Sequence, residues 1–272
     1  MSRSWPTMGT FAEVIIDTTR EDKADRAIED VRDVFDRVNR TMTVYKPHSD
    51  MNRFNRWAGH RSVSVDPWLI DLVDLSCRAE RATRGAFSLN VLAYGQRDGL
   101  KPEFPGTRVP VKPGLSTCQI HTNSILSRLS SPSVSHGLDA GGIAKGYALD
   151  RAREQLIAHG FRKFFIRLGR SFYAGNSPGN SKGWPVKIVG TDDPVFLKQS
   201  VLSVSQQGVQ TDTGHVVDPR TGQVVERSMA VAVFAREGWV SDAVSTALLV
   251  DPGLRSRVRS RFPEIQSIRF IR

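Results

Sequence analysis

The sequence predicts an α+β protein in which mixed sheets pack against helices. Apolar residues recur at helical spacing in several stretches, and short runs rich in branched residues lie between them. These two kinds of segment do not alternate strictly, and strict alternation would instead favour a doubly wound parallel sheet. The 272 residues are enough for one large domain, and we expect a single domain over residues 1–272.

The first half of the chain carries two strong helix signals. Residues 22–40 place apolar side chains at spacings of three and four, with charges on the other face. Asp66 and Pro67 supply an N-cap and a proline in the first turn of a helix that runs towards Arg84 and Gly85. Around these helices we predict a strand at 10–17, a polar loop at 42–52, a short strand at 63–65 and an aperiodic loop at 95–114.

The second half contains most of the predicted strands. Residues 139–146 form a glycine-rich turn that leads into a helix ending near Gly160. Another apolar helix is expected at 239–250. Two weak strands are predicted between residues 118 and 134, followed by strands at 161–168, 185–189, 201–205 and 231–234, with a glycine-studded loop at 171–184.

The net charge of +10 favours anionic partners such as nucleotides, acidic proteins or nucleic acid. Arginines are scattered, and they gather only at residues 255–261, where a solvated helix face is the simpler interpretation. A basic nucleic-acid-binding module is therefore an alternative supported by charge alone.

Cys77 and Cys118 are the only cysteines, and they have neither metal-ligand spacing nor the number expected of a disulfide framework. We expect Cys77 to be a small core residue. The first ten residues contain no charged-then-apolar leader, so we expect a cytoplasmic protein, or a periplasmic one if a signal was removed. No apolar run is long enough to span a membrane.

Three stretches can carry chemistry. In the glycine turn, backbone N–H groups and Lys145 can face a phosphate, although a glycine turn before an ordinary helix explains the same pattern. His215 lies three residues before Asp218, and a neutral imidazole can accept a hydroxyl proton; a histidine bonded to backbone is the alternative. Asp242 and Thr246 share a helix face and can hold Mg²⁺, or act only as an N-cap and an internal threonine.

Taken together, these stretches resemble the ApbE family, the FAD:protein FMN transferases. The resemblance runs in order along nearly the whole chain. It is carried by TMGT at residues 7–10, MTVYKPHSDMNRFN at 42–55, LDAGGIAKG at 138–146, HVVDPRTG at 215–222 and SDAVST at 241–246.

The resemblance implies a Mg²⁺-dependent enzyme that moves FMN from FAD to a Thr or Ser hydroxyl of a target flavoprotein and releases AMP. It implies His215 as the general base. The implied metal site consists of the Gly142 carbonyl, Asp242 and Thr246. The implied FAD-binding residues are Met8, Tyr45, Ala86, Phe87, Ser88, Asp139, Lys145 and Val217. Tyr45 would stack on a flat ring, whereas its position alone favours packing against the core.

The chain departs from the family pattern at three places. Gln206 and Gln207 replace the usual Thr-Ser, Ser88 replaces an Asp, and Arg170 replaces the second glycine of a pair. An FAD-binding or FAD-hydrolysing protein without protein transfer is therefore the second alternative.

Overall fold

A seven-stranded sheet runs through the computed structural model, which describes residues 1–179, 181–207 and 216–271. All neighbouring strands are antiparallel. The strand order is β1 (Ser2–Thr7), β2 (Thr10–Ile16), β6 (Phe164–Leu168), β7 (Ser171–Ala174), β10 (Ser200–Gln206), β13 (Ala230–Ala235) and β14 (Ile265–Ile271). The predicted α+β class is confirmed.

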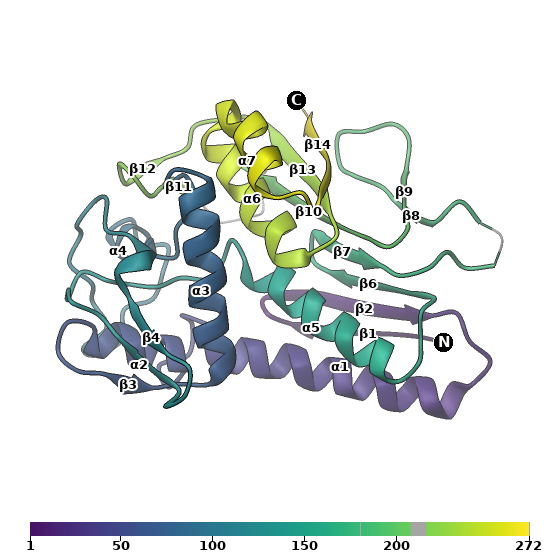
Figure 1. Cartoon of the computed structure of the whole chain (residues 1–272), viewed down its shortest axis with the longest axis horizontal. Coiled ribbons are helices and arrows are strands. Elements are labelled where there is room, and N and C mark those ends of the chain that lie inside the picture. The colour runs from purple at the N-terminus through teal and green to yellow at the C-terminus, as the bar shows by residue number, and fades with distance from the viewer. Residues whose placement is uncertain (180, 208–215, 272) are drawn as a thin grey trace.

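Helices cover one face of this sheet, and a β-hairpin covers part of the other. Because side chains alternate along a strand, Phe164 and Ile166 pack with α1 (Glu21–Met42), α5 (Ala144–Ala158) and α6 (Gly238–Val250) in the larger core. Phe165 points to the opposite face, where it stacks on Trp184. That ring belongs to a two-stranded sheet of β8 (Trp184–Val186) and β9 (Val195–Leu197). Figure 1 shows α5 and α6 lying over the sheet.

The segments between α1 and α5 form a second layer of structure beside α5 and α6 (Figure 1). Its long helix is α3 (Pro67–Ala82), where Asp66 accepts a hydrogen bond from the Trp68 amide at 2.9 Å, as the predicted N-cap requires. The other elements here are α2 (Asp50–Trp57), α4 (Leu92–Arg97), the 3₁₀ turn η1 (Thr117–Gln119) and a sheet of β3 (Val63–Ser64), β5 (Arg128–Ser130) and β4 (His121–Asn123).

The C-terminal part adds a hairpin and two short helical segments. The hairpin of β11 (Val217–Asp218) and β12 (Gln223–Val224) precedes β13. After α6 come the 3₁₀ turn η2 (Pro252–Leu254) and α7 (Arg255–Arg261). Arg257 of α7 donates hydrogen bonds to the carbonyls of Arg81 and Ala82 at the C-terminal end of α3. One of the clustered arginines therefore caps a helix, while Arg255, Arg259 and Arg261 are exposed as predicted.

Helices α5 and α6 cross in direct backbone contact. A Cβ atom on Gly146 would lie 2.1 Å from the Gly238 carbonyl oxygen, and a Cβ on Gly238 would lie 2.2 Å from the Gly146 carbonyl oxygen. No side chain larger than hydrogen fits at either position without moving a helix. This close approach brings the turn before α5 next to the middle of α6.

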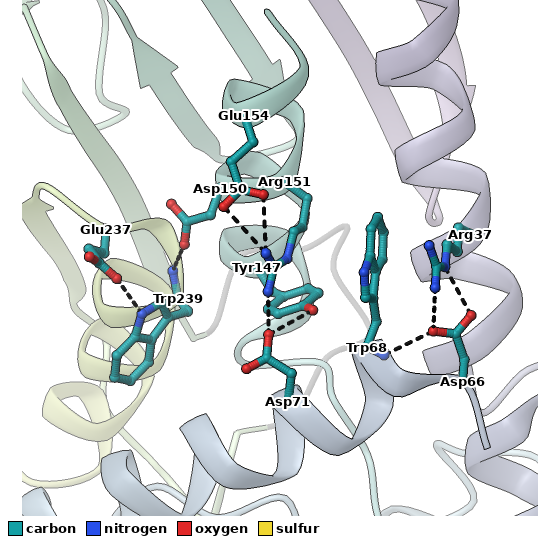
Figure 2. Close-up of polar contacts among 10 residues, drawn as sticks. All are labelled: Arg37, Asp66, Trp68, Asp71, Tyr147, Asp150, Arg151, Glu154, Glu237 and Trp239. Carbon is teal, nitrogen blue, oxygen red and sulfur yellow. Dashed lines mark hydrogen bonds and ion pairs between the residues drawn. The ribbon is translucent and has the colours of Figure 1, made fainter. Parts of the chain in front are cut away.

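Polar side chains fix the same crossing (Figure 2). The Asp150 carboxylate of α5 accepts hydrogen bonds from the amides of Gly238 and Trp239 at 2.6 and 2.9 Å, so it caps α6 from outside that helix. Burial raises the pKa of Asp150 to about 7, although these two hydrogen bonds act in the opposite direction. On the other side of α5, the Tyr147 hydroxyl donates to Asp71 of α3 at 3.0 Å.

Several strands and helix boundaries differ from the sequence-based expectation. No strand is expected where β1, β7, β9, β11, β12 and β14 lie, and β7 lies inside the expected loop at 171–184. In β1 the residues Ser2, Arg3 and Ser4 are exposed, because this strand forms the sheet edge, and so it lacks an alternating apolar pattern. Helix α2 begins within the expected loop at 42–52, and α4 extends into the expected loop at 95–114.

The expectation about the cysteines is wrong. Cys77 of α3 and Cys118 of η1 form a disulfide with their Cα atoms 4.9 Å apart. Their separation of 41 residues carries no local signal, because only the packing of η1 against the side of α3 brings the two thiols together. The disulfide fixes η1, which contains Thr117, against α3.

Candidate functional site

Several turns and strand ends gather at one end of the seven-stranded sheet. Pairing of Thr7 with Thr10 puts the β1–β2 turn there, and pairing of Leu168 with Ser171 puts the β6–β7 turn at the same end. Because Ser203 pairs with Ser171, the C-terminal end of β10 lies there as well. Backbone hydrogen bonds from Gly169 to Phe11 and from Val204 to Arg170 join these segments.

Helix α6 meets the glycine turn at this end of the sheet. The Gly146 amide donates to Asp242 Oδ2 at 2.9 Å. A Cβ atom on Gly142 would lie 3.1 Å from Thr246 Oγ1, so the backbone of the turn is close to that hydroxyl. Thr246 Oγ1 also lies 3.3 Å from Ser205 Oγ of β10. Gly142 of the glycine turn therefore converges with Asp242 and Thr246 of α6, which lie far away in the sequence.

Asp242 is not the N-cap of α6. The helix begins at Gly238, more than one turn earlier than an N-cap at Asp242 would require, and its first amides bind Asp150. Asp242 is 4% exposed and lies in the helix interior. A buried carboxylate that accepts one backbone hydrogen bond can accept further partners, so Asp242 can also serve as a metal ligand.

The oxygen atoms at this convergence are of the kind that Mg²⁺ prefers. Asp242 and Thr246 supply one carboxylate and one hydroxyl, and the adjoining turn residue Gly142 carries a carbonyl; all three are hard donors. Within residues 1–179, 181–207 and 216–271, no group of three or more His, Cys, Asp or Glu side chains forms a metal site. A cation bound here would thus take its remaining ligands from water or from a phosphate-bearing ligand, which is the usual behaviour of Mg²⁺.

Asp139 and Lys145 lie at the two ends of the glycine turn. Asp139 Oδ1 accepts a hydrogen bond from the Gly141 amide at 2.9 Å and so fixes the turn. Lys145 Nζ is 3.4 Å from the Gly141 carbonyl oxygen and is partly buried in the first turn of α5. A cation therefore stands beside the turn, as the sequence predicted.

Lys101 is a residue of this site that the sequence reasoning missed. Its Nζ pairs with Asp139 Oδ2 at 2.8 Å and donates to the Tyr45 hydroxyl at 3.1 Å. It also lies 5.0 Å from the centroid of the Tyr45 ring. No sequence signal marked Lys101, because it follows α4 in a segment without periodicity.

Tyr45 does not pack against the core. Its side chain is 61% exposed, and Lys101 contacts both its hydroxyl and its ring. The expectation based on position alone is wrong here, and an exposed ring beside the glycine turn fits the stacking role implied by the family resemblance.

The segment at 86–88 packs next to the glycine turn at Gly142. Ala86 and Phe87 are buried, and a Cβ on Gly142 would lie 3.4 Å from the Phe87 ring. Ser88 Oγ donates to Glu80 Oε2 at 2.9 Å and lies 3.0 Å from Thr117 Oγ1. Ser88 thus ties α3 to the disulfide-bonded η1, and its hydroxyl is engaged inside the protein.

Met8 lies in the β1–β2 turn at this end of the sheet, and Val217 lies in the β11–β12 hairpin. Met8 adopts a φ of 48° and Gly9 a φ of 70°, as a tight hairpin turn requires, and Met8 is partly buried against the core. Val217 belongs to β11 and is half-buried. His215 lies outside the described residues; next to that segment, the Val216 amide donates to Gln207 Oε1 at 2.9 Å.

Together, the fold and this convergence define an α+β protein with an oxygen-rich site where a glycine turn meets a helix interior at one end of an antiparallel sheet. The ApbE family model matches residues 8–257, and the chain belongs to that family.

Curated relatives and solved structures agree with this membership. FAD:protein FMN transferases from Klebsiella pneumoniae (strain 342) and Escherichia coli (strain K12) are 25% and 24% identical to the chain. Each alignment covers 90% of this chain and 76% of the relative. The apo flavinyl transferase ApbE from Pseudomonas stutzeri has the same fold, with a TM-score of 0.83, 23% identity and coverage of 100% of this chain and 91% of that one.

Proposed function

We propose that this chain is an FAD:protein FMN transferase. It would move FMN from FAD to a Thr or Ser hydroxyl of a target flavoprotein, release AMP and act as one domain over residues 1–272. The observation that carries the proposal is the convergence of Gly142, Asp242 and Thr246 at the glycine turn, in a chain whose curated relatives bear that name.

In this proposal the diphosphate of FAD lies at the glycine turn. The Lys145 ammonium provides positive charge for it, whereas the amides of Gly141 and Gly146 already donate within the protein. Asp242, Thr246 and the Gly142 carbonyl would hold Mg²⁺, which supplies stabilisation of the negative charge on phosphate oxygens when bound. Asp242 is kept in place by the Gly146 amide, so its orientation depends on the close crossing of α5 and α6.

The flat rings of FAD would lie between the exposed Tyr45 ring and the Met8 turn, with Phe87 and Val217 completing the apolar lining. Tyr45 supports this assignment because an exposed aromatic ring can gain a stacking partner without unpacking the core. Asp139 is assigned to shaping the turn, and Ala86 and Ser88 to the buried packing of their own segment, because their atoms already contact the protein.

His215 remains the proposed general base, on the strength of its motif. It would accept the proton of the acceptor hydroxyl as the hydroxyl oxygen attacks the FMN phosphorus, and the AMP phosphate would leave with the bonding electrons. Base catalysis of this kind contributes roughly 10²–10⁴-fold to a rate. His215→Ala should bind FAD and fail to transfer FMN.

The test is incubation with FAD, Mg²⁺ and an acceptor domain, followed by mass spectrometry. An added FMN mass on the acceptor supports transfer. Free FMN and AMP with an unmodified acceptor would instead indicate FAD hydrolysis. Absence of FAD binding, together with salt-sensitive binding of DNA or RNA, would favour the nucleic-acid alternative.

The compartment is a separate part of the proposal. No helix in the described part of the chain is both long and apolar enough to cross a membrane. The Cys77–Cys118 disulfide favours an oxidising compartment, because cytosolic thiols are usually kept reduced. We therefore assign the chain to the periplasmic alternative rather than to the cytoplasm, and fractionation followed by thiol labelling without reductant tests this assignment.

A further inference from the structure

A cluster of three side chains consists of Lys101, Asp139 and Tyr45. The family resemblance assigns no role to Lys101 or to the cluster. The three residues come from separate segments, and the two charged side chains are mostly buried, with 23% of Lys101 and 11% of Asp139 exposed. From this geometry we infer that Lys101 is a positioning residue of the proposed FAD site, which neutralises Asp139 and orients the Tyr45 ring. The inference rests on the proposed function.

The first argument concerns the charge of Asp139. Its carboxylate starts the turn at which the diphosphate is proposed to bind, and an unpaired negative charge there would repel an anionic ligand. Both of its oxygens are engaged, with Oδ1 bonded to the Gly141 amide and Oδ2 to Lys101. The ion pair therefore lets Asp139 fix the turn while the site retains its attraction for anions.

The second argument concerns the Tyr45 ring. An exposed tyrosine on a loop would sample several rotamers, and ordering it on ligand binding would cost affinity. Lys101 Nζ holds its hydroxyl at 3.1 Å and lies 5.0 Å from the ring centroid. The ring is thereby restrained before any ligand arrives, and its exposed surface is available for stacking.

The backbone and stem of Lys101 are themselves held. The amides of Leu100 and Lys101 both donate to the Gly95 carbonyl, at 2.8 and 3.0 Å. A Cβ atom on Gly95 would lie 2.4 Å from Lys101 Cγ, so the absence of a side chain at Gly95 lets the lysine stem pass. Burial by itself lowers the pKa of Lys101, but the contacts with Asp139 and Tyr45 outweigh it and raise the pKa overall.

The experiment measures FAD affinity by quenching of flavin fluorescence in the full chain. We expect Lys101→Met to weaken FAD binding about ten-fold or more, because it exposes an uncompensated carboxylate to the diphosphate. Lys112→Met is the matched control: Lys112 is exposed in the same segment and makes no hydrogen bond or ion pair within the described residues. That control should change the affinity less than about two-fold.

A double-mutant cycle separates charge neutralisation from general damage. In an Asp139→Asn background the carboxylate is absent, so Lys101→Met should weaken FAD binding far less than it does in the wild type. In steady-state transfer assays, Lys101→Met should raise KM for FAD while kcat stays within about two-fold, because a positioning residue does not touch the reacting atoms.

Gly95→Ala provides a second variant, in which the positive charge of Lys101 is retained. It should displace the Lys101 stem and weaken FAD binding, although alanine favours the α4 helix. Equal effects of Lys101→Met and Lys112→Met, or equal effects of Lys101→Met with and without Asp139, would overturn the inference. Failure of the wild type to bind FAD would overturn the proposed function as well, whereas wild-type binding with unaffected variants would overturn only the role of Lys101.

Discussion

Replacement of Gly146 by alanine tests the helix crossing on which the candidate site depends. The added Cβ would lie 2.1 Å from the Gly238 carbonyl oxygen, 2.5 Å from the Gly238 carbonyl carbon and 2.8 Å from Asp242 Cβ. The two nearest atoms belong to the backbone, so no side-chain rotation relieves the overlap, and α5 must move away from α6.

The size of the effect follows from two opposing contributions. Overpacking of a close-packed core typically costs about 1–3 kcal/mol. Alanine is favoured over glycine in a helix by at most about 1 kcal/mol, and less in the first turn, where Gly146 lies. We therefore expect Gly146→Ala to lower the free energy of unfolding by about 2 kcal/mol. The melting temperature should fall by roughly 4–8 °C, since about 2–4 °C per kcal/mol is usual for chains of 150–250 residues.

Urea denaturation monitored by circular dichroism measures this change. Gly141→Ala is the control, because Gly141 lies in an exposed turn and its added Cβ would meet only the Asp139 side chain, at 3.3 Å from Oδ1. The same shift of α5 would displace the Gly146 amide from Asp242 Oδ2, so Gly146→Ala should also weaken Mg²⁺ binding. A Gly146→Ala protein as stable as the wild type would show that the two helices do not meet at backbone contact.

Three further predictions follow from other contacts. Replacing Cys77 and Cys118 by serine should lower the free energy of unfolding by about 4 kcal/mol, the chain-entropy value for a loop of 41 residues, as measured by urea denaturation with and without reductant. Asp242→Asn should raise the Mg²⁺ concentration needed for half-maximal FAD binding about ten-fold, because it removes a charged hard ligand; unchanged metal dependence in a titration would argue against the site. The pKa of Asp150 is raised from 3.8 to about 7 in the folded protein. Its protonation therefore stabilises the fold fully below about pH 4, and this stabilisation is lost as the pH rises to 7. Asp150→Asn should abolish that part of the pH dependence of the free energy of unfolding, and an unchanged pH profile would contradict this prediction.

The sequence by itself determined the elements whose signals are local. Helix α1 has an apolar stripe repeated over six turns, and α3 starts at the predicted Asp66 and Pro67. The glycine turn, the helix that follows it and the shared face of Asp242 and Thr246 were likewise evident. Each of these signals depends on residues within a few positions of one another, so periodicity and capping reveal them.

The tertiary structure alone decided which distant residues meet. Lys101 reaches Asp139 and Tyr45 because α4 and Gly95 direct its stem there, and Cys77 meets Cys118 because η1 packs against α3. Edge strand β1 was missed because an exposed edge imposes no alternating pattern. Such contacts depend on how whole elements pack, and the energy of that packing is not encoded in the spacing of neighbouring residues.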